Sequence, residues 1–205
     1  MRIVFALTAT LIAAGCRKAD DAIRRDDTTT VPPVSVLADS PVAGLTKACG
    51  ITGLPVVTDN GIGELREGLS VADVKARCDV VSDSEELGTE GMTERVLIVR
   101  IAGETVRAIV NDDRISRIEI SSPRFTTTDS LGVDTPLRRI ARMRGARFFP
   151  GEGGVYGFIA DHCALSFRFS VPLRPPRGGG WTAASIDSAH GDAAVDRVLV
   201  TRCQR

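Results

Sequence analysis

Aromatic residues are scarce in this 205-residue chain, where phenylalanine, tyrosine and tryptophan together make up 4% of the sequence. Lysine is also scarce, because arginine supplies all but three of the 26 basic residues. Acidic residues also number 26, so the formal net charge is zero. A balanced chain has no overall attraction to nucleic acid, so we predict no nucleic-acid partner. With few aromatic rings, the core must consist mainly of valine, isoleucine, leucine and alanine.

The sequence also lacks an apolar run long enough to cross a membrane. Its most apolar segment, residues 3–14, follows a single positive charge at Arg2. This segment has the length of a signal-peptide core, whereas a membrane-spanning helix needs about 20 residues. It leads into Ala13-Ala14-Gly15-Cys16, which resembles the bacterial lipobox, with Ala13 in place of the usual leucine. The resemblance implies cleavage before Cys16 and attachment of lipid to its thiol. An ordinary secretory signal beside a chance cysteine is the alternative.

The residues after Cys16 indicate which membrane would hold the protein and how far the domain could lie from the lipid surface. Arg17 follows the cysteine, where aspartate is associated with retention in the inner membrane of enteric bacteria. We therefore expect a cell-envelope protein, anchored to the membrane through its lipid and facing the periplasm from the outer membrane if the organism has one. Charged residues, a threonine run and Pro32-Pro33 predict a flexible tether over residues 16–45. Such a tether spans on the order of 30 Å.

After the signal peptide (1–15) and the tether, we predict one α+β domain over residues 46–205, made of two related halves at about 46–125 and 126–205. In the first half, Ser70 is a suitable cap for a helix that extends to Cys78. A polar loop is expected next. Apolar runs at 96–99, 106–110 and 115–120, separated by turn residues at 102–104 and 111–113, predict a three-stranded antiparallel meander.

The second half repeats this order. Asp134 or Thr135 can cap a helix that begins near Pro136 and ends before Gly145. Strands are expected at 155–160, 165–169 and 195–201, with a turn at 150–154 and a long irregular loop over about 174–193. The predicted fold class is therefore α+β, with tandem helix-plus-antiparallel-meander repeats after a signal peptide and a flexible tether.

Residues 68–74, Gly-Leu-Ser-Val-Ala-Asp-Val, resemble the Gly-Met-Thr helix entry of small outer-membrane lipoproteins of the SmpA/OmlA type. A helix and meander occurring twice also resembles the β-lactamase-inhibitor-like proteins. Cys78-Asp79 replaces the usual Leu-Gly after the helix. The resemblance implies an α+β fold and a binding or scaffolding role, and it carries over no catalytic residue.

Four cysteines remain once Cys16 is set aside: Cys49, Cys78, Cys163 and Cys203. An even number in an exported chain favours disulfides. Of the three possible pairings, we favour Cys49–Cys78 and Cys163–Cys203, because each pair then lies within one half. A metal site is the alternative, although no Cys-x-x-Cys spacing occurs and only His162 and His190 could complete it. We predict no cofactor.

Two residue groups resemble catalytic sets. His162 and Cys163 are adjacent, but neighbouring side chains on a strand point to opposite faces, which argues against a thiol dyad. Ser185, Asp187 and His190 lie close in the predicted loop, yet no Gly-x-Ser-x-Gly motif surrounds the serine. A polar surface loop is the interpretation that we favour for them.

The second helix and its exit carry five arginines: Arg138, Arg139, Arg142, Arg144 and Arg147. Such a surface can contact anionic headgroups, or it can be an ordinary solvated helix face. We favour a non-enzymatic, lipid-anchored envelope protein that binds an unknown envelope protein partner. The alternatives are a small envelope hydrolase using Ser185, Asp187 and His190, and an inhibitor of a secreted enzyme.

Overall fold

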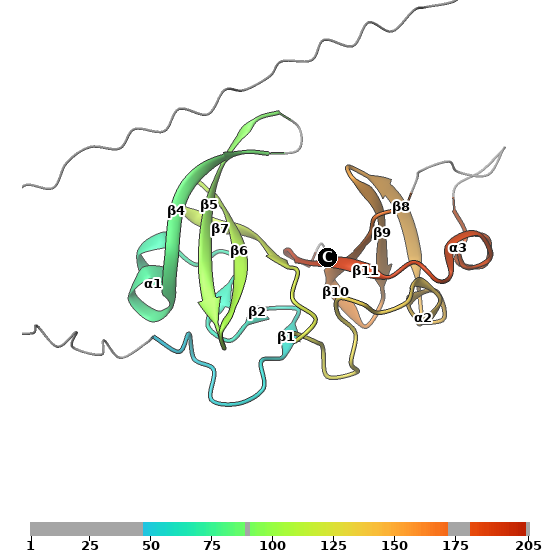
Figure 1. The fold of residues 1–205 in the computed structure, drawn as a ribbon, viewed down its shortest axis with the longest axis horizontal. Coiled ribbons are helices and arrows are strands. Elements are labelled where there is room, and N and C mark those ends of the chain that lie inside the picture. Colours follow the sequence, from blue (N-terminus) through green and yellow to red (C-terminus); the bar gives the residue numbers. More distant parts are fainter. Residues whose placement is uncertain (1–46, 89–90, 172–180, 204–205) are drawn as a thin grey trace, which may run out of the picture. The chain divides into compact units, whose positions relative to one another are not determined.

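The computed structural model describes residues 47–88, 91–171 and 181–203 (Figure 1). The predicted signal peptide, the lipidation site Cys16 and the tether lie outside the described residues. Among the residues that are described, no helix has both the length and the apolar character needed to cross a membrane.

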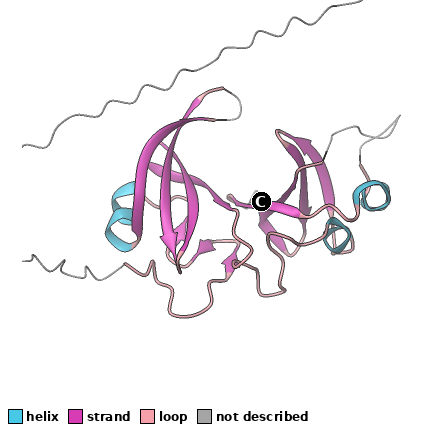
Figure 2. Ribbon diagram, in the orientation of Figure 1, coloured by secondary structure: helices cyan, strands magenta, loops and turns pink. Residues whose placement is uncertain are grey.

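An eight-stranded antiparallel sheet dominates the described region (Figures 1 and 2). Its strands, in spatial order, are β4 (Asp79–Leu87), β5 (Thr93–Ile101), β6 (Glu104–Asn111), β7 (Arg114–Ile120), β11 (Val195–Val200), β10 (His162–Phe169), β9 (Gly154–Ile159) and β8 (Arg147–Gly151). A smaller sheet contains β1 (Val57–Thr58), β2 (Gly61–Ile62) and β3 (Leu65–Arg66). The pairing of β7 with β11 therefore joins the two predicted halves in one sheet.

Within the described residues, three short helices accompany the sheets: α1 (Val71–Arg77), α2 (Leu137–Ala141) and α3 (Ala183–His190). The predicted cap of the first helix is confirmed, since the Ser70 hydroxyl accepts the Asp73 backbone N–H at 3.1 Å. The two predicted hairpin turns are also present. Asp112 and Asp113 both have positive φ, at 48° and 59°, as a tight turn between β6 and β7 requires.

Alternation along the strands separates an apolar face from a polar one. On β6, Val106, Ala108 and Val110 are buried, while Arg107 lies between them on the other face. The same alternation on the neighbouring strands adds Ile118, Ile120, Val198, Val200, Phe167 and Phe169 to the core. The opposite face carries the charged side chains, together with the buried apolar residues Val96, Ile109 and Leu199.

The structure confirms a mixture of helices and strands but corrects several predicted elements. Residues 79–87 form β4, where a polar loop was expected, so four strands follow α1. The second half also gains β8, because residues 147–151 pair with β9. Residues 183–190 form α3 inside the segment predicted as an irregular loop. Pro136, rather than Asp134 or Thr135, is the N-cap of α2, and no side chain bonds to that cap.

Cross-strand ion pairs explain how β4, despite its polar sequence, forms a strand. The Asp83 carboxylate accepts hydrogen bonds from Arg95 on β5 at 2.8 Å and from Lys75 on α1 at 2.7 Å. These bonds, first the one from Arg95 and then the one from Lys75, hold the Asp83 pKa far below its usual range. Ion pairs with β5 and α1 therefore help to hold β4 at the edge of the sheet.

The depressed Asp83 pKa predicts a measurable loss of stability in acid. A carboxyl group with a lowered folded-state pKa stabilises the fold above its unfolded pKa of about 4 and loses that contribution as the pH falls below it. We expect Asp83→Asn to remove up to about 1 kcal/mol of unfolding free energy at pH 6 and less at pH 3. Urea unfolding at both pH values would measure this, with Asp112→Asn at an exposed turn as the control. Equal losses for Asp83→Asn at the two pH values would contradict it.

Candidate functional site

A groove of about 560 Å³ lies on the polar face of the large sheet. Its lining comes from adjacent strands: Glu94 on β5, Arg107 on β6, Arg117 and Glu119 on β7, Arg197 and Leu199 on β11, Arg168 on β10, and Tyr156 on β9. Strand register places these side chains together, because Arg107 is directly opposite Glu119, and Glu119 is directly opposite Leu199. The groove is therefore a product of the pairing between β7 and β11.

Glu119 is the centre of the groove, with only 5% of its side chain exposed. Its Oε1 accepts a hydrogen bond from Arg117 Nε at 2.9 Å, and its Oε2 accepts one from Arg197 Nη1 at 2.8 Å. Arg107 Nε lies 3.4 Å from the same Oε2. A buried carboxylate without such partners would be strongly destabilising, so the three guanidinium groups are what allows Glu119 to be there.

Further acidic groups surround this centre. Arg107 also pairs with Glu86 on β4 at 2.7 Å, and Arg117 lies 3.4 Å from Glu94. Burial lowers the pKa of Arg107, but the carboxylates of Glu86 and Glu119 outweigh that effect and raise it overall. Arg107 therefore keeps its charge throughout the ordinary pH range.

Arg168 forms a separate bidentate pair with Asp196, with nitrogen–oxygen distances of 2.8 and 2.9 Å. Burial raises the pKa of Asp196, while hydrogen bonds from Arg168 and Ser170 lower it by more. The planar, two-point geometry fixes the Arg168 guanidinium beside the groove. Tyr156 lies directly opposite Arg168 across β9 and β10.

Tyr156 begins an aromatic strip on the same side of the sheet. Its hydroxyl donates to the backbone oxygen of Glu152 at 2.8 Å, which holds one end of the ring. Phe149 lies opposite Tyr156 on β8 and makes an edge-to-face contact with Phe158, with ring centroids 5.7 Å apart. Phe149 and Phe158 remain 51% and 38% exposed. In a chain so poor in aromatic residues, two of the few rings are therefore open to solvent on this face.

Among the described residues, the lining of the groove includes no histidine, cysteine or serine. It therefore offers arginine donors, carboxylates and one tyrosine, but none of the usual pairs of nucleophile and base. Such a set of donors and acceptors can hydrogen-bond to a polar ligand.

The predicted hydrolase residues are not brought together as a triad. Ser185 belongs to the capping box of α3, where its Oγ accepts the Thr182 backbone N–H at 2.9 Å. His190 is five residues further along the helix, about 140° around its axis, and contacts Trp181 instead. The segment is thus a capped helix rather than the polar loop expected from the sequence.

The adjacent His162 and Cys163 do not form a dyad either. Cys163 is bonded to Cys203, and Cys49 is bonded to Cys78, which confirms the favoured pairing. His162 Nε2 instead lies 3.1 Å from Asp129 Oδ1. Sulfur atoms joined to one another cannot serve as thiolate ligands, so the alternative of a metal site built on the four cysteines does not fit the structure.

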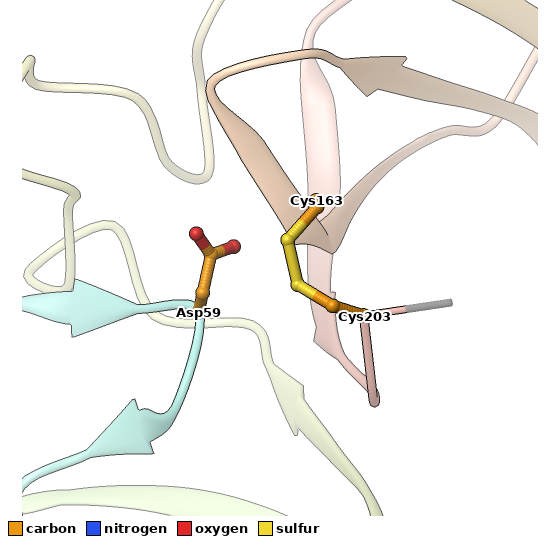
Figure 3. Close-up of side chains that lie close together, drawn as sticks. All are labelled: Asp59, Cys163 and Cys203. Carbon is orange, nitrogen blue, oxygen red and sulfur yellow. A yellow bond between two sulfur atoms is a disulfide. The ribbon is translucent and has the colours of Figure 1, made fainter. Parts of the chain in front are cut away.

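Asp59, in the turn between β1 and β2, lies beside the second disulfide (Figure 3). Its carboxylate oxygen and the sulfurs of Cys163 and Cys203 all lie within 4.8 Å of one another. With the sulfurs bonded, the carboxylate has a structural role: it accepts the Ala164 backbone N–H at 2.9 Å and ties the small sheet to β10.

The five arginines around α2 are partly neutralised. Arg138 forms an ion pair with Asp192, Arg144 forms one with Asp161, and Arg139 donates to the backbone oxygen of Asp129. Arg142 and Arg147 have no such ion pair within the described parts of the chain. The set is therefore a less basic surface than its sequence indicates.

Comparison with known proteins supports the fold and no more. No family model and no curated protein matches this chain. Among solved structures, it is similar to the crystal structure of the uncharacterized protein yfeY from Escherichia coli, with a TM-score of 0.52 and 17% sequence identity. The match covers 71% of this chain and 99% of that one. The two proteins therefore share a fold.

Proposed function

We propose that this chain is an exported lipoprotein of the bacterial cell envelope, anchored through Cys16, whose domain binds another envelope component without catalysing a reaction. One observation carries the proposal: the two disulfides account for all four cysteines of the predicted domain and leave Cys16 as the only other cysteine. Disulfides form in oxidising compartments outside the cytoplasm. The remaining cysteine ends a segment with the length of a signal-peptide core.

The order of elements supports the proposed relation between the two halves. Helix α1 precedes the meander β4–β7, and helix α2 precedes β8, β9, β10 and β11. The last strands of the two series, β7 and β11, pair antiparallel in the middle of the sheet. We take this order as two copies of one helix-and-meander unit, with α3 added before the final strand.

The groove and the aromatic strip on the large sheet support the proposed binding role. The polar face of this sheet holds the charged groove, with arginine donors and carboxylate acceptors, and the exposed aromatic strip. A sheet face of this kind can engage a ligand while the lipid holds the protein at the membrane.

Metabolic labelling tests the anchor. Cells that produce the full chain would be fed alkyne-palmitate, and the purified protein would be coupled to a fluorophore. We expect label on the natural chain and at least a tenfold lower signal for Cys16→Ser. Cys163→Ser is the matched control, since it removes a cysteine of the domain and should keep the label. Persistent labelling of Cys16→Ser, or an unlabelled natural chain, would reject lipid anchoring at this residue.

A further inference from the structure

Three side chains of metal-ligating types, Asp59, Cys163 and Cys203, meet at the second disulfide (Figure 3). We call them the Asp59 cluster. One carboxylate oxygen and the two sulfurs all lie within 4.8 Å of one another. Cys163 is exposed, and Asp59 and Cys203 are partly exposed. Both a reductant and a metal ion can therefore reach the cluster from solvent.

Backbone hydrogen bonds hold this cluster together independently of the disulfide. Ala164 follows Cys163, and its N–H donates to the Asp59 carboxylate at 2.9 Å. The carbonyl oxygen of Ala164 accepts the N–H of Thr201, two residues before Cys203, also at 2.9 Å. From there β10 and β11 pair along their length. None of these bonds involves sulfur, so reduction of the disulfide leaves the three side chains close together.

The spacing of the donors suits zinc. In a tetrahedral zinc site, with Zn–S bonds of about 2.3 Å, two sulfur ligands lie about 3.8 Å apart. The Cα atoms of Cys163 and Cys203 are 5.1 Å apart, so rotation of the two reduced side chains can give this separation without moving the strands. One oxygen of Asp59 accepts the Ala164 N–H, and this bond leaves the second oxygen for a metal. Ligating carboxylates are commonly oriented by such hydrogen bonds, and thiolate ligands favour zinc over harder ions.

A cavity of about 350 Å³ lies beside the cluster, and Asp59 and Cys203 belong to its lining. It has room for a water molecule as the fourth ligand of zinc. The two carboxylates and two guanidinium groups of the lining offset one another, so two thiolates formed by reduction would make these surroundings negative. A bound cation would neutralise that charge. The charged members of the lining are Asp59, Glu67, Arg66 and Arg202.

We propose that Asp59, Cys163 and Cys203 form a zinc site that exists only while the second disulfide is reduced. An external dithiol gives two electrons and two protons to the Cys163–Cys203 bond and itself becomes a disulfide. Zn²⁺ then binds the two sulfurs and the Asp59 carboxylate, and the two thiol protons pass to solvent. Exchange with an oxidised dithiol reforms the bond and releases the ion. The inference goes beyond the proposed envelope role and does not rest on the lipid at Cys16.

Titration of the full chain with Co²⁺ tests the site, because cobalt bound to thiolate absorbs strongly in the near ultraviolet. The chain would be purified in detergent, reduced with a phosphine and freed of reductant without air. Mass spectrometry of alkylated peptides would report which disulfide has opened. We expect saturable binding of a single Co²⁺ by the reduced chain, and its displacement by Zn²⁺. The oxidised chain should give no thiolate band.

Two variants locate the ion. Asp59→Asn keeps an oxygen for the Ala164 N–H but loses the charged ligand, so it should weaken Co²⁺ binding about tenfold or more. Cys163→Ser removes a thiolate and should abolish saturable binding. Asp161→Asn is the matched control, because Asp161 lies two residues before Cys163 but pairs with Arg144 instead of joining the cluster. Circular dichroism of each reduced chain would show that it is folded.

Several outcomes would overturn the inference. These are a reduced chain that takes up no Co²⁺ or unfolds, equal affinity in Asp59→Asn and Asp161→Asn, and binding that survives in Cys163→Ser, which would place the ion at the other disulfide. Cys16→Ser should bind Co²⁺ as the natural chain does. The palmitate experiment separates the two proposals, since a lipidated chain that binds no metal keeps the envelope role and loses only the zinc site.

Discussion

Replacing Cys49 and Cys78 together by alanine should lower the free energy of unfolding by about 3–4 kcal/mol. The bond closes a loop between residues 29 apart in sequence, which contains the whole small sheet and α1. Without it the unfolded chain gains conformational freedom, and the folded chain loses two side chains that are 0% and 1% exposed. Urea unfolding followed by circular dichroism would measure the change, with the slope of the transition showing whether two-state behaviour is kept.

The second disulfide provides the comparison. Cys163 and Cys203 are 40 residues apart, so loop closure alone predicts a similar loss for their double alanine variant. Cys163 is exposed, however, so this variant lacks the additional loss of buried packing. A mild reductant should therefore open Cys163–Cys203 first, as mass spectrometry of alkylated peptides would show. Equal rates of reduction for the two bonds would contradict this account, as would unchanged stability of the Cys49→Ala, Cys78→Ala variant.

Local patterns in the sequence predicted some elements well. The cap at Ser70, the turn at residues 111–113 and the disulfide pairs each depend on residues close in sequence or on a simple count. Strand β4 was missed because its nine residues do not alternate between apolar and polar. Its stability comes from Arg95 and Lys75, which belong to other elements.

Helix α3 carried a local signal that could have been used. Thr182 and Ser185 form a reciprocal capping box, but only Ile186 is buried on the helix, so no apolar period marked it. The groove could be predicted only in part. Alternation places Arg107 and Glu119 on the polar faces of their strands, whereas the pairing of β7 with β11 brings Arg197 to them across 78 residues. Strand order of this kind is set by the packing of the whole domain.

Phe169→Ala should cost about 3–5 kcal/mol of unfolding free energy, the range for truncating a fully buried phenylalanine. Phe169 is 0% exposed, and its ring lies 6.3 Å from that of Phe148. The surrounding space is tight, because a Cβ placed on Gly157 would lie 3.3 Å from the Phe169 ring and 3.2 Å from Ile140. The cavity left by Phe169→Ala should therefore stay largely unfilled, since the chain has few other aromatic rings that could move into it.

Phe149→Ala is the matched control for that substitution. Phe149 lies two strands away on the polar face and is 51% exposed, so its loss should cost less than about 1 kcal/mol. Urea unfolding of both variants would compare them, and equal losses would show that the apolar face is not the core. If Phe149 also contacts a partner, its truncation should weaken binding of that partner while stability stays nearly unchanged. The two phenylalanines thereby separate the face that holds the fold together from the face that is free to bind.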